Sequence, residues 1–89
     1  MARNPMPEGR WSDVMARDYF SCQASAYAFP TGQPCSGRLV VHHRKLKGAG
    51  GSRDPEIHAL DNLVVLCDGH HREIHAHPDA ARACGLIVR

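Results

Sequence analysis

Histidines occur at two places in this 89-residue chain with spacings that suit metal chemistry. His42 and His43 are adjacent, and His71 is followed four positions later by His75. Residues four apart lie one turn apart on the same face of a helix, so the second pair can hold one cation between two imidazoles. A third ligand has to come from another part of the fold, and either His42 or His43 can supply it. This combination predicts a three-histidine metal site.

The segment from Arg38 to Arg44 is rich in β-branched residues and predicts a strand that carries the first histidine pair. Adjacent strand residues point to opposite faces, so only one of His42 and His43 should face the metal. The other can act as a general base, because a neutral imidazole with a pKa of about 6.5 accepts a proton near neutral pH. Three protein ligands also leave coordination positions open for phosphate and water. These features indicate metal-assisted hydrolysis.

Short elements must position these histidines, and turn residues mark their boundaries. Before the strand at 38–44, the sequence predicts a helix at 12–18 with Ser12 as its N-cap, and then a knuckle or extended loop at 19–37. After that strand it predicts a Gly-rich loop at 47–55 and a helical turn or strand at 61–67. The last predicted elements are a helix at 68–77, a second helix from Pro78 to a cap at Gly85, and a closing strand at 86–88. The order of elements favours a small α+β fold.

The length predicts one domain, with residues 1–10 as a flexible N-terminal arm and residues 11–89 as the folded part. The chain has four Cys and seven His, but only two Phe, two Tyr and one Trp. So small a core usually needs a metal or disulfides for support. No apolar run approaches the roughly 20 residues of a membrane span, and the N-terminus lacks the hydrophobic segment of a signal peptide. We therefore expect a cytoplasmic protein without membrane contact, whose cysteines bind metal or remain free thiols.

Basic residues gather in one segment, although the net charge of the chain is only +2. Residues 38–53 contain no acid and five basic side chains, which are Arg38, Arg44, Lys45, Lys47 and Arg53. A solvated basic loop is one interpretation of this segment. The other is a polyanionic partner such as DNA, because a local positive patch attracts phosphate.

Three separated motifs together resemble the HNH endonucleases, a family with the ββα-metal (His-Me finger) fold. They are Val-His-His-Arg at 41–44 followed by a Gly-Gly loop, Asp-Asn-Leu-Val-Val-Leu-Cys at 61–67, and His-His-Arg-Glu-Ile-His at 70–75. This motif core covers residues 38–78, and the compact length resembles small HNH proteins of actinobacterial phages. The resemblance implies a single HNH nuclease domain at 11–89.

The resemblance also implies a role for each motif residue. His42 would be the first metal ligand, and His43 the general base that activates the attacking water. Asn62 would brace the loop and so orient the base, while His71 and His75 would be the helix ligands. Many family members carry Asp where this chain has His42, so the site should favour Zn, Ni, Co or Mn rather than Mg alone.

The implied activity is metal-dependent hydrolysis of DNA phosphodiesters, by nicking or by double-strand cleavage, with 5′-phosphate and 3′-hydroxyl products. Arg44, Lys45, Lys47 and Arg53 would contact backbone phosphates, which carry no sequence information. A monomer or weak dimer is expected. Phage relatives imply a role in genome packaging beside terminase subunits or the portal, and restriction or mobile-element roles remain alternatives. Two non-catalytic functions also remain, a zinc-binding DNA-binding module and a terminase-associated adaptor.

Many HNH proteins carry a structural zinc on two Cys-x-x-Cys knuckles, and this chain departs from that pattern. Twelve residues separate its first two cysteines, and Cys67-x-x-His70 replaces the second knuckle. The expected structural zinc site is therefore Cys22, Cys35, Cys67 and His70, a closed tetrahedral set. Cys84 is an alternative to His70, and His70 could exchange roles with His71. The two remaining histidines, His58 and His77, are expected at the surface.

Overall fold

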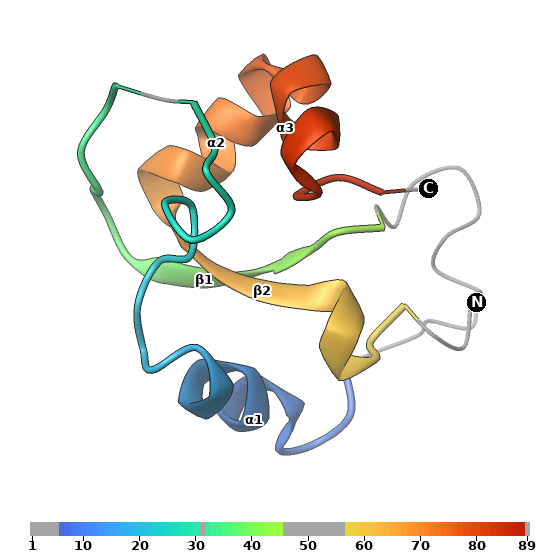
Figure 1. Cartoon of the computed structure of the whole chain (residues 1–89). Coiled ribbons are helices and arrows are strands. Elements are labelled where there is room, and N and C mark those ends of the chain that lie inside the picture. Colours follow the sequence, from blue (N-terminus) through green and yellow to red (C-terminus); the bar gives the residue numbers. More distant parts are fainter. Residues whose placement is uncertain (1–5, 31, 46–56, 89) are drawn as a thin grey trace, which may run out of the picture.

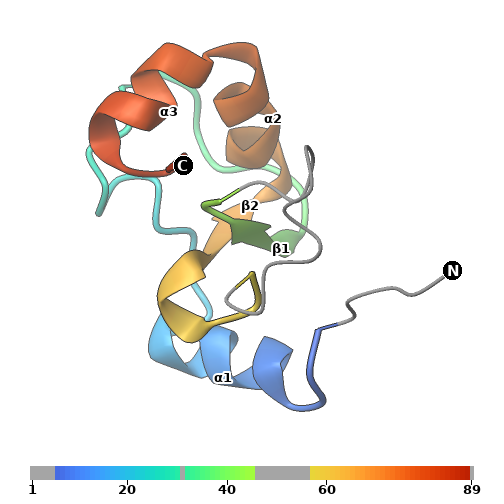
Figure 2. The ribbon, with the colours of Figure 1, turned by 90° about the vertical axis from the view of Figure 1, so that its right-hand side faces the viewer.

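Two antiparallel strands form the centre of the fold and carry helices on both faces. The computed structural model describes residues 6–30, 32–45 and 57–88. Its elements are α1 (Arg10–Arg17), β1 (Leu39–His43), the 3-10 turn η2 (Leu60–Asn62), β2 (Leu63–Cys67), α2 (Asp68–Ala76) and α3 (Pro78–Cys84) (Figure 1). Figure 2 shows α1 on one side of the strand pair and α2 with α3 on the other. The small α+β class is confirmed, and two strands followed by helices give a ββα-like order.

Both faces of β2 are buried, which explains its continuous apolar sequence Leu-Val-Val-Leu-Cys. Val64 and Leu66 pack toward α2 and α3, whereas Leu63 and Val65 pack toward α1. The first cluster of buried residues comprises Ala24, Phe29, Val64, Leu66, Ile74, Ala81, Leu86 and Ile87. The second comprises Val14, Met15, Leu63 and Val65. The sheet therefore separates two small cores.

The same alternation governs β1, which pairs with β2 from Leu39 opposite Cys67 to His43 opposite Leu63. Leu39 and Val41 pack with the α1 cluster and Val40 with the other. A period of two then directs His42 toward α2 and His43 toward the α1 side. The prediction that these two histidines point to opposite faces is confirmed.

Several boundaries differ from the sequence predictions. Helix α1 begins at Arg10, preceded by Gly9 with φ 83°, so Ser12 lies inside the helix and not at its N-cap. A 3-10 turn and a strand both occur in 60–67, where either one alone was expected. Residues 86–88 do not form a strand, because Val88 makes only an isolated parallel bridge with Lys45.

The predicted junction between α2 and α3 is present. Pro78 begins α3, where its missing N–H costs no hydrogen bond, and Gly85 caps the end with φ 91°. The Gly-rich loop predicted at 47–55 lies outside the described residues. None of the described helices has the length and apolar character to cross a membrane.

Asp18 closes the edge of β2 that faces away from β1. Its Oδ2 accepts a hydrogen bond of 2.9 Å from the Val65 N–H, and Arg17 pairs with its Oδ1 at 2.9 Å. The Val65 carbonyl accepts from the Gln23 N–H at 2.9 Å. Burial raises the pKa of Asp18, but the Arg17 and Val65 donors outweigh it and hold the pKa below its ordinary value. Asp18 thus supplies the hydrogen-bond acceptor that a neighbouring strand would otherwise offer to the Val65 N–H.

Replacing Asp18 by Ala should lower the free energy of unfolding by about 1–3 kcal/mol, because the buried Val65 N–H loses its acceptor. Urea unfolding at neutral pH measures the effect. Asp79→Ala is the matched control, since Asp79 is fully exposed and its carboxylate pairs with Arg82 at the surface. Equal stability of the two variants would show that Asp18 does not support the strand edge.

Candidate metal centres

Three histidines from two elements converge on one point. His42 comes from β1, and His71 and His75 come from successive turns of α2. One nitrogen from each ring lies within 4.8 Å of the other two. The ring centroids are 5.2 Å (His42–His71), 6.2 Å (His42–His75) and 5.0 Å (His71–His75) apart, all edge to face. The predicted grouping is therefore formed, and it can hold a metal ion.

The C-terminal segment fixes how His42 presents its ring. Its Nε2 lies 2.6 Å from the Leu86 carbonyl oxygen, which can only accept a hydrogen bond. Nε2 therefore carries the proton, and Nδ1 carries the lone pair that a metal needs. His42 is buried, His71 half-buried and His75 exposed. The site thus has one closed side and one side open to solvent, as metal sites that bind substrate require.

Burial also favours the neutral form of His42 and His71. It lowers the pKa of His42 to about 4, with His71 and His75 adding to the shift and the Leu86 carbonyl opposing it. The pKa of His71 is lowered by burial and by His75. Metal ligation requires neutral imidazole, so burial favours the binding form of His42 and His71.

A second group offers four ligand atoms, two from buried residues (Cys67 and His70), one from half-buried Cys22 and one from exposed Cys35. The Nδ1 of His70 lies 3.4, 3.6 and 3.1 Å from the Sγ atoms of Cys22, Cys35 and Cys67 respectively. Bonds of about 2.0–2.3 Å in a tetrahedron place ligand atoms roughly 3.5 Å apart, so the four atoms fit one zinc ion. The predicted set is thus brought together, and it can bind a metal such as zinc. Cys84 lies outside it, with its Sγ directed to the Ala81 carbonyl at 3.4 Å.

Main-chain groups orient this cluster. The Nε2 of His70 is 2.9 Å from the Gln33 carbonyl oxygen, which leaves Nδ1 as the unprotonated nitrogen facing the sulfurs. Cys67 Sγ accepts from the N–H groups of Ser36 at 3.4 Å and His70 at 3.3 Å. Burial raises the pKa of Cys67, but these donors lower it to about 7. These contacts therefore favour Cys67 as a thiolate that can bind metal.

The close approach of 36–38 to α2 explains how widely spaced cysteines meet. The N–H of Asp68 donates to the Arg38 carbonyl at 2.7 Å. Gly37 has φ 77°, and a Cβ there would lie 2.7 Å from the Asp68 Cβ. Glycine therefore permits this turn, which sets Cys35 beside Cys67. The ligand set joins three segments of the chain, around Cys22, around Cys35 and at the start of α2.

His43 contacts a histidine that the sequence prediction placed wrongly. Its Nε2 lies 3.0 Å from the Nδ1 of His58, and the rings meet edge to face at 5.0 Å. His58 is 5% exposed, so the expectation of a surface residue is wrong, whereas His77 is exposed as expected. His58 lies fifteen positions after His43, and no spacing rule connects them. The local signal for burial of His58 was the apolar residue before it in the sequence, Ile57, which is fully buried in the structure.

Asn62 joins Lys45 and Ile57, the two residues that flank the segment 46–56. Its Oδ1 accepts from the Lys45 N–H at 2.8 Å, and its Nδ2 donates to the Ile57 carbonyl at 2.7 Å. The Asn62 carbonyl also accepts from the Arg44 N–H at 2.8 Å. These contacts hold the main chain at Lys45, two residues beyond His43, and at Ile57.

The predicted phosphate contacts have different surroundings. The Arg44 guanidinium donates to the Gly85 carbonyl at 2.8 Å and to the Asp61 carbonyl at 2.9 Å, and it lies 5.8 Å from the centroid of the Tyr27 ring. Arg44 thus links the end of β1 to the end of α3. Lys45 lies in the bridge to Val88. Lys47 and Arg53 lie outside the described residues.

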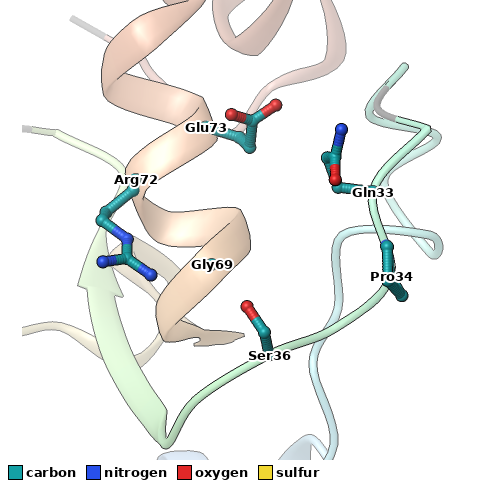
Figure 3. A pocket seen from close by; sticks show the side chains of 6 residues that line it. All are labelled: Gln33, Pro34, Ser36, Gly69, Arg72 and Glu73. Carbon is teal, nitrogen blue, oxygen red and sulfur yellow. The ribbon is translucent and has the colours of Figure 1, made fainter.

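A surface hollow lies between the segment before β1 and the outer side of α2 (Figure 3). In this view the Gln33 and Glu73 side chains flank the opening, and Arg72 extends away from it. Its lining residues are Gln33, Pro34, Ser36, Gly69, Arg72 and Glu73. None of these six belongs to either candidate ligand group.

Comparison of the chain with known protein families, with curated proteins and with solved structures finds no match. The geometry of the two ligand groups is therefore the basis on which function is inferred. One group is closed by four ligands and joins separate segments, as structural zinc sites do. The other has three nitrogen ligands and an open side, which is the arrangement of sites where a bound ion contacts substrate.

Replacing Cys35 by Ser should remove one equivalent of bound zinc and lower the melting temperature by at least about 10 °C, because metal binding there adds to folding energy. Elemental analysis and thermal unfolding measure the two effects. Cys84→Ser is the control and should keep both values. Unchanged zinc and melting in Cys35→Ser would rule out the Cys22, Cys35, Cys67 and His70 site.

Metal binding at the three-histidine group should release few protons at pH 5.5. His42 is already neutral there, and the lowered pKa of His71 reduces its share. We expect fewer than about two protons released, whereas three ordinary histidines would release nearly three. Calorimetric titration of Ni²⁺ or Zn²⁺ into zinc-loaded protein, in buffers of different ionisation enthalpy, counts these protons. Release of nearly three would contradict the burial effect.

Proposed function

We propose that this chain is a metal-dependent DNA endonuclease of the HNH (ββα-metal) type. The convergence of His42, His71 and His75 at a site with one open side supports this proposal most directly. Two further features fit it: His43 follows the first ligand on the same strand, and Asn62 braces the chain just beyond. The proposal also accounts for the separate four-ligand cluster, since so small a fold needs a support away from its reaction site.

In this proposal the residues divide the work of phosphodiester hydrolysis. A divalent ion held by the three histidines would stabilise negative charge on the phosphate oxygens. His43 accepts the proton of the attacking water, and it lies on the opposite face of β1 from the ligand His42. Asn62 fixes the main chain that follows His43. Cys22, Cys35, Cys67 and His70 hold a structural zinc that ties α2 to the N-terminal half.

DNA is the proposed substrate because the basic residues are close in sequence to the site. Lys45, Lys47 and Arg53 are the proposed phosphate contacts, and Arg44 contributes mainly by bracing β1 through its carbonyl partners. Phosphate contacts give affinity without sequence preference, so cleavage should be weakly specific. One copy of the site cuts one strand. We propose a monomer or weak dimer that acts in the bacterial cytoplasm, beside terminase or portal during phage genome packaging.

A non-catalytic zinc-binding module that binds DNA is the second candidate, and the closed cysteine–histidine cluster favours it. A terminase-associated adaptor without nuclease activity would have the same cluster. Both alternatives leave the second, open group of histidines without a purpose. They predict DNA or partner binding that survives the loss of His43.

A supercoiled-plasmid nicking assay tests the proposal with Mg, Mn, Ni, Co or Zn added after removal of loosely bound metal. His43→Ala should reduce the nicking rate by about 10²- to 10⁴-fold while metal content stays unchanged, because a positioned base contributes that much. His77→Ala, which removes an exposed histidine at the end of α2, should match the wild type. DNA binding without cleavage under every metal would favour the binding module.

A further inference from the structure

The nitrogen contact between His43 and His58 is the interaction that the proposed mechanism leaves unused. The His43 Nε2 and the His58 Nδ1 are 3.0 Å apart, a normal hydrogen-bond distance. His43 is half-buried, whereas His58 is 5% exposed. One ring therefore reaches toward solvent, and the other holds it from within the protein.

His58 is itself held by its surroundings. The neighbouring Ile57 is fully buried, and its carbonyl accepts from the Asn62 side chain at 2.7 Å. The His58 carbonyl accepts from the Arg10 guanidinium of α1. Asn62 also holds Lys45, so one side chain fixes the main chain next to His58 and just beyond His43. The two rings thus meet between anchored stretches of backbone.

A hydrogen bond between two imidazoles needs one N–H and one lone pair. We infer that His43 donates from Nε2 to the Nδ1 of His58, and that His58 is the positioning residue for the general base. This inference rests on the proposed function of His43. The bond fixes the ring orientation of His43 and selects the tautomer whose lone pair is on Nδ1, the form that can accept a proton from water. An acceptor side chain behind a catalytic histidine has the same role in hydrolase triads.

A purely structural role for His58 makes a different prediction. If the buried ring only fills space, His58→Phe should be tolerated, because it keeps an aromatic ring of similar size. His58→Asn would then be the more harmful change, since it leaves a cavity. If the nitrogen positions His43, the order reverses, because Asn offers a polar atom near the place of Nδ1 and Phe offers none.

The test measures plasmid nicking by the wild type, His58→Phe, His58→Asn and His77→Ala. His58→Phe should lower the rate constant at saturating DNA by roughly 10- to 100-fold, less than the roughly 10²- to 10⁴-fold loss for removing the base itself. The DNA concentration for half-maximal rate and the metal content should not change. His58→Asn should recover most of the rate. Equal rates in His58→Phe and wild type would overturn the inference.

Nitrogen-15 NMR of histidine-labelled full-length protein separates this inference from the proposed function. The wild type should show His43 protonated at Nε2, and His58→Phe should show a mixture of tautomers. That result, together with no nicking by the wild type, would retain the histidine pair and reject the nuclease. Protonation of His43 at Nδ1 in the wild type would reject the positioning role even if the plasmid is cut.

Discussion

The alternation of side chains along β1 is the constraint on which the rest of the molecule depends. Two neighbouring residues at the end of this strand must face opposite layers, so His42 turns toward α2 and His43 toward the α1 side. Each layer then needs its own apolar cluster to hold the strand pair in place. A shift of one residue in the register would exchange the two histidines and also move every core residue of the strand to the opposite layer. The pairing with the fully buried β2 opposes such a shift, because both of its faces are already committed.

Helix α2 divides its surface among three neighbours in the same way. Each residue advances by about 100° around the axis, so consecutive side chains reach different surroundings. His70 enters the cysteine cluster, His71 and His75 face His42, and Ile74 packs into the core. Cys67 begins this helix as its N-cap and also serves as a zinc ligand candidate, so the helix start and the cluster depend on one thiol. A metal bound at this cluster would fix the start of α2 and, through the helix, the positions of His71 and His75 in the open histidine site.

The sequence could predict those parts of the site that follow from local spacing. His71 and His75 share a helix face because of their four-residue separation, and Cys67 and His70 meet across one turn. His58 could not be placed in this way, because its contact with His43 depends on the path of a long connection and leaves no periodic signal. The basic segment and the family resemblance predict Arg44 as a phosphate contact. Its carbonyl partners come from chain segments that only the folded protein brings near.

In each buried candidate ligand histidine, a main-chain carbonyl determines which ring nitrogen is left to bind metal. The Leu86 carbonyl does this for His42, and the Gln33 carbonyl does it for His70. Every residue has a main-chain carbonyl oxygen, whatever its side chain. The amino-acid types at positions 33 and 86 therefore do not reveal this role. What matters is the path of the backbone, which Gly85 and Arg44 set near the first histidine. Ligand orientation in this protein therefore depends on how segments outside the histidine and cysteine motifs are packed. The spacing of histidines and cysteines predicts which residues could bind metal, but the geometry that makes them competent to do so comes from the core around them.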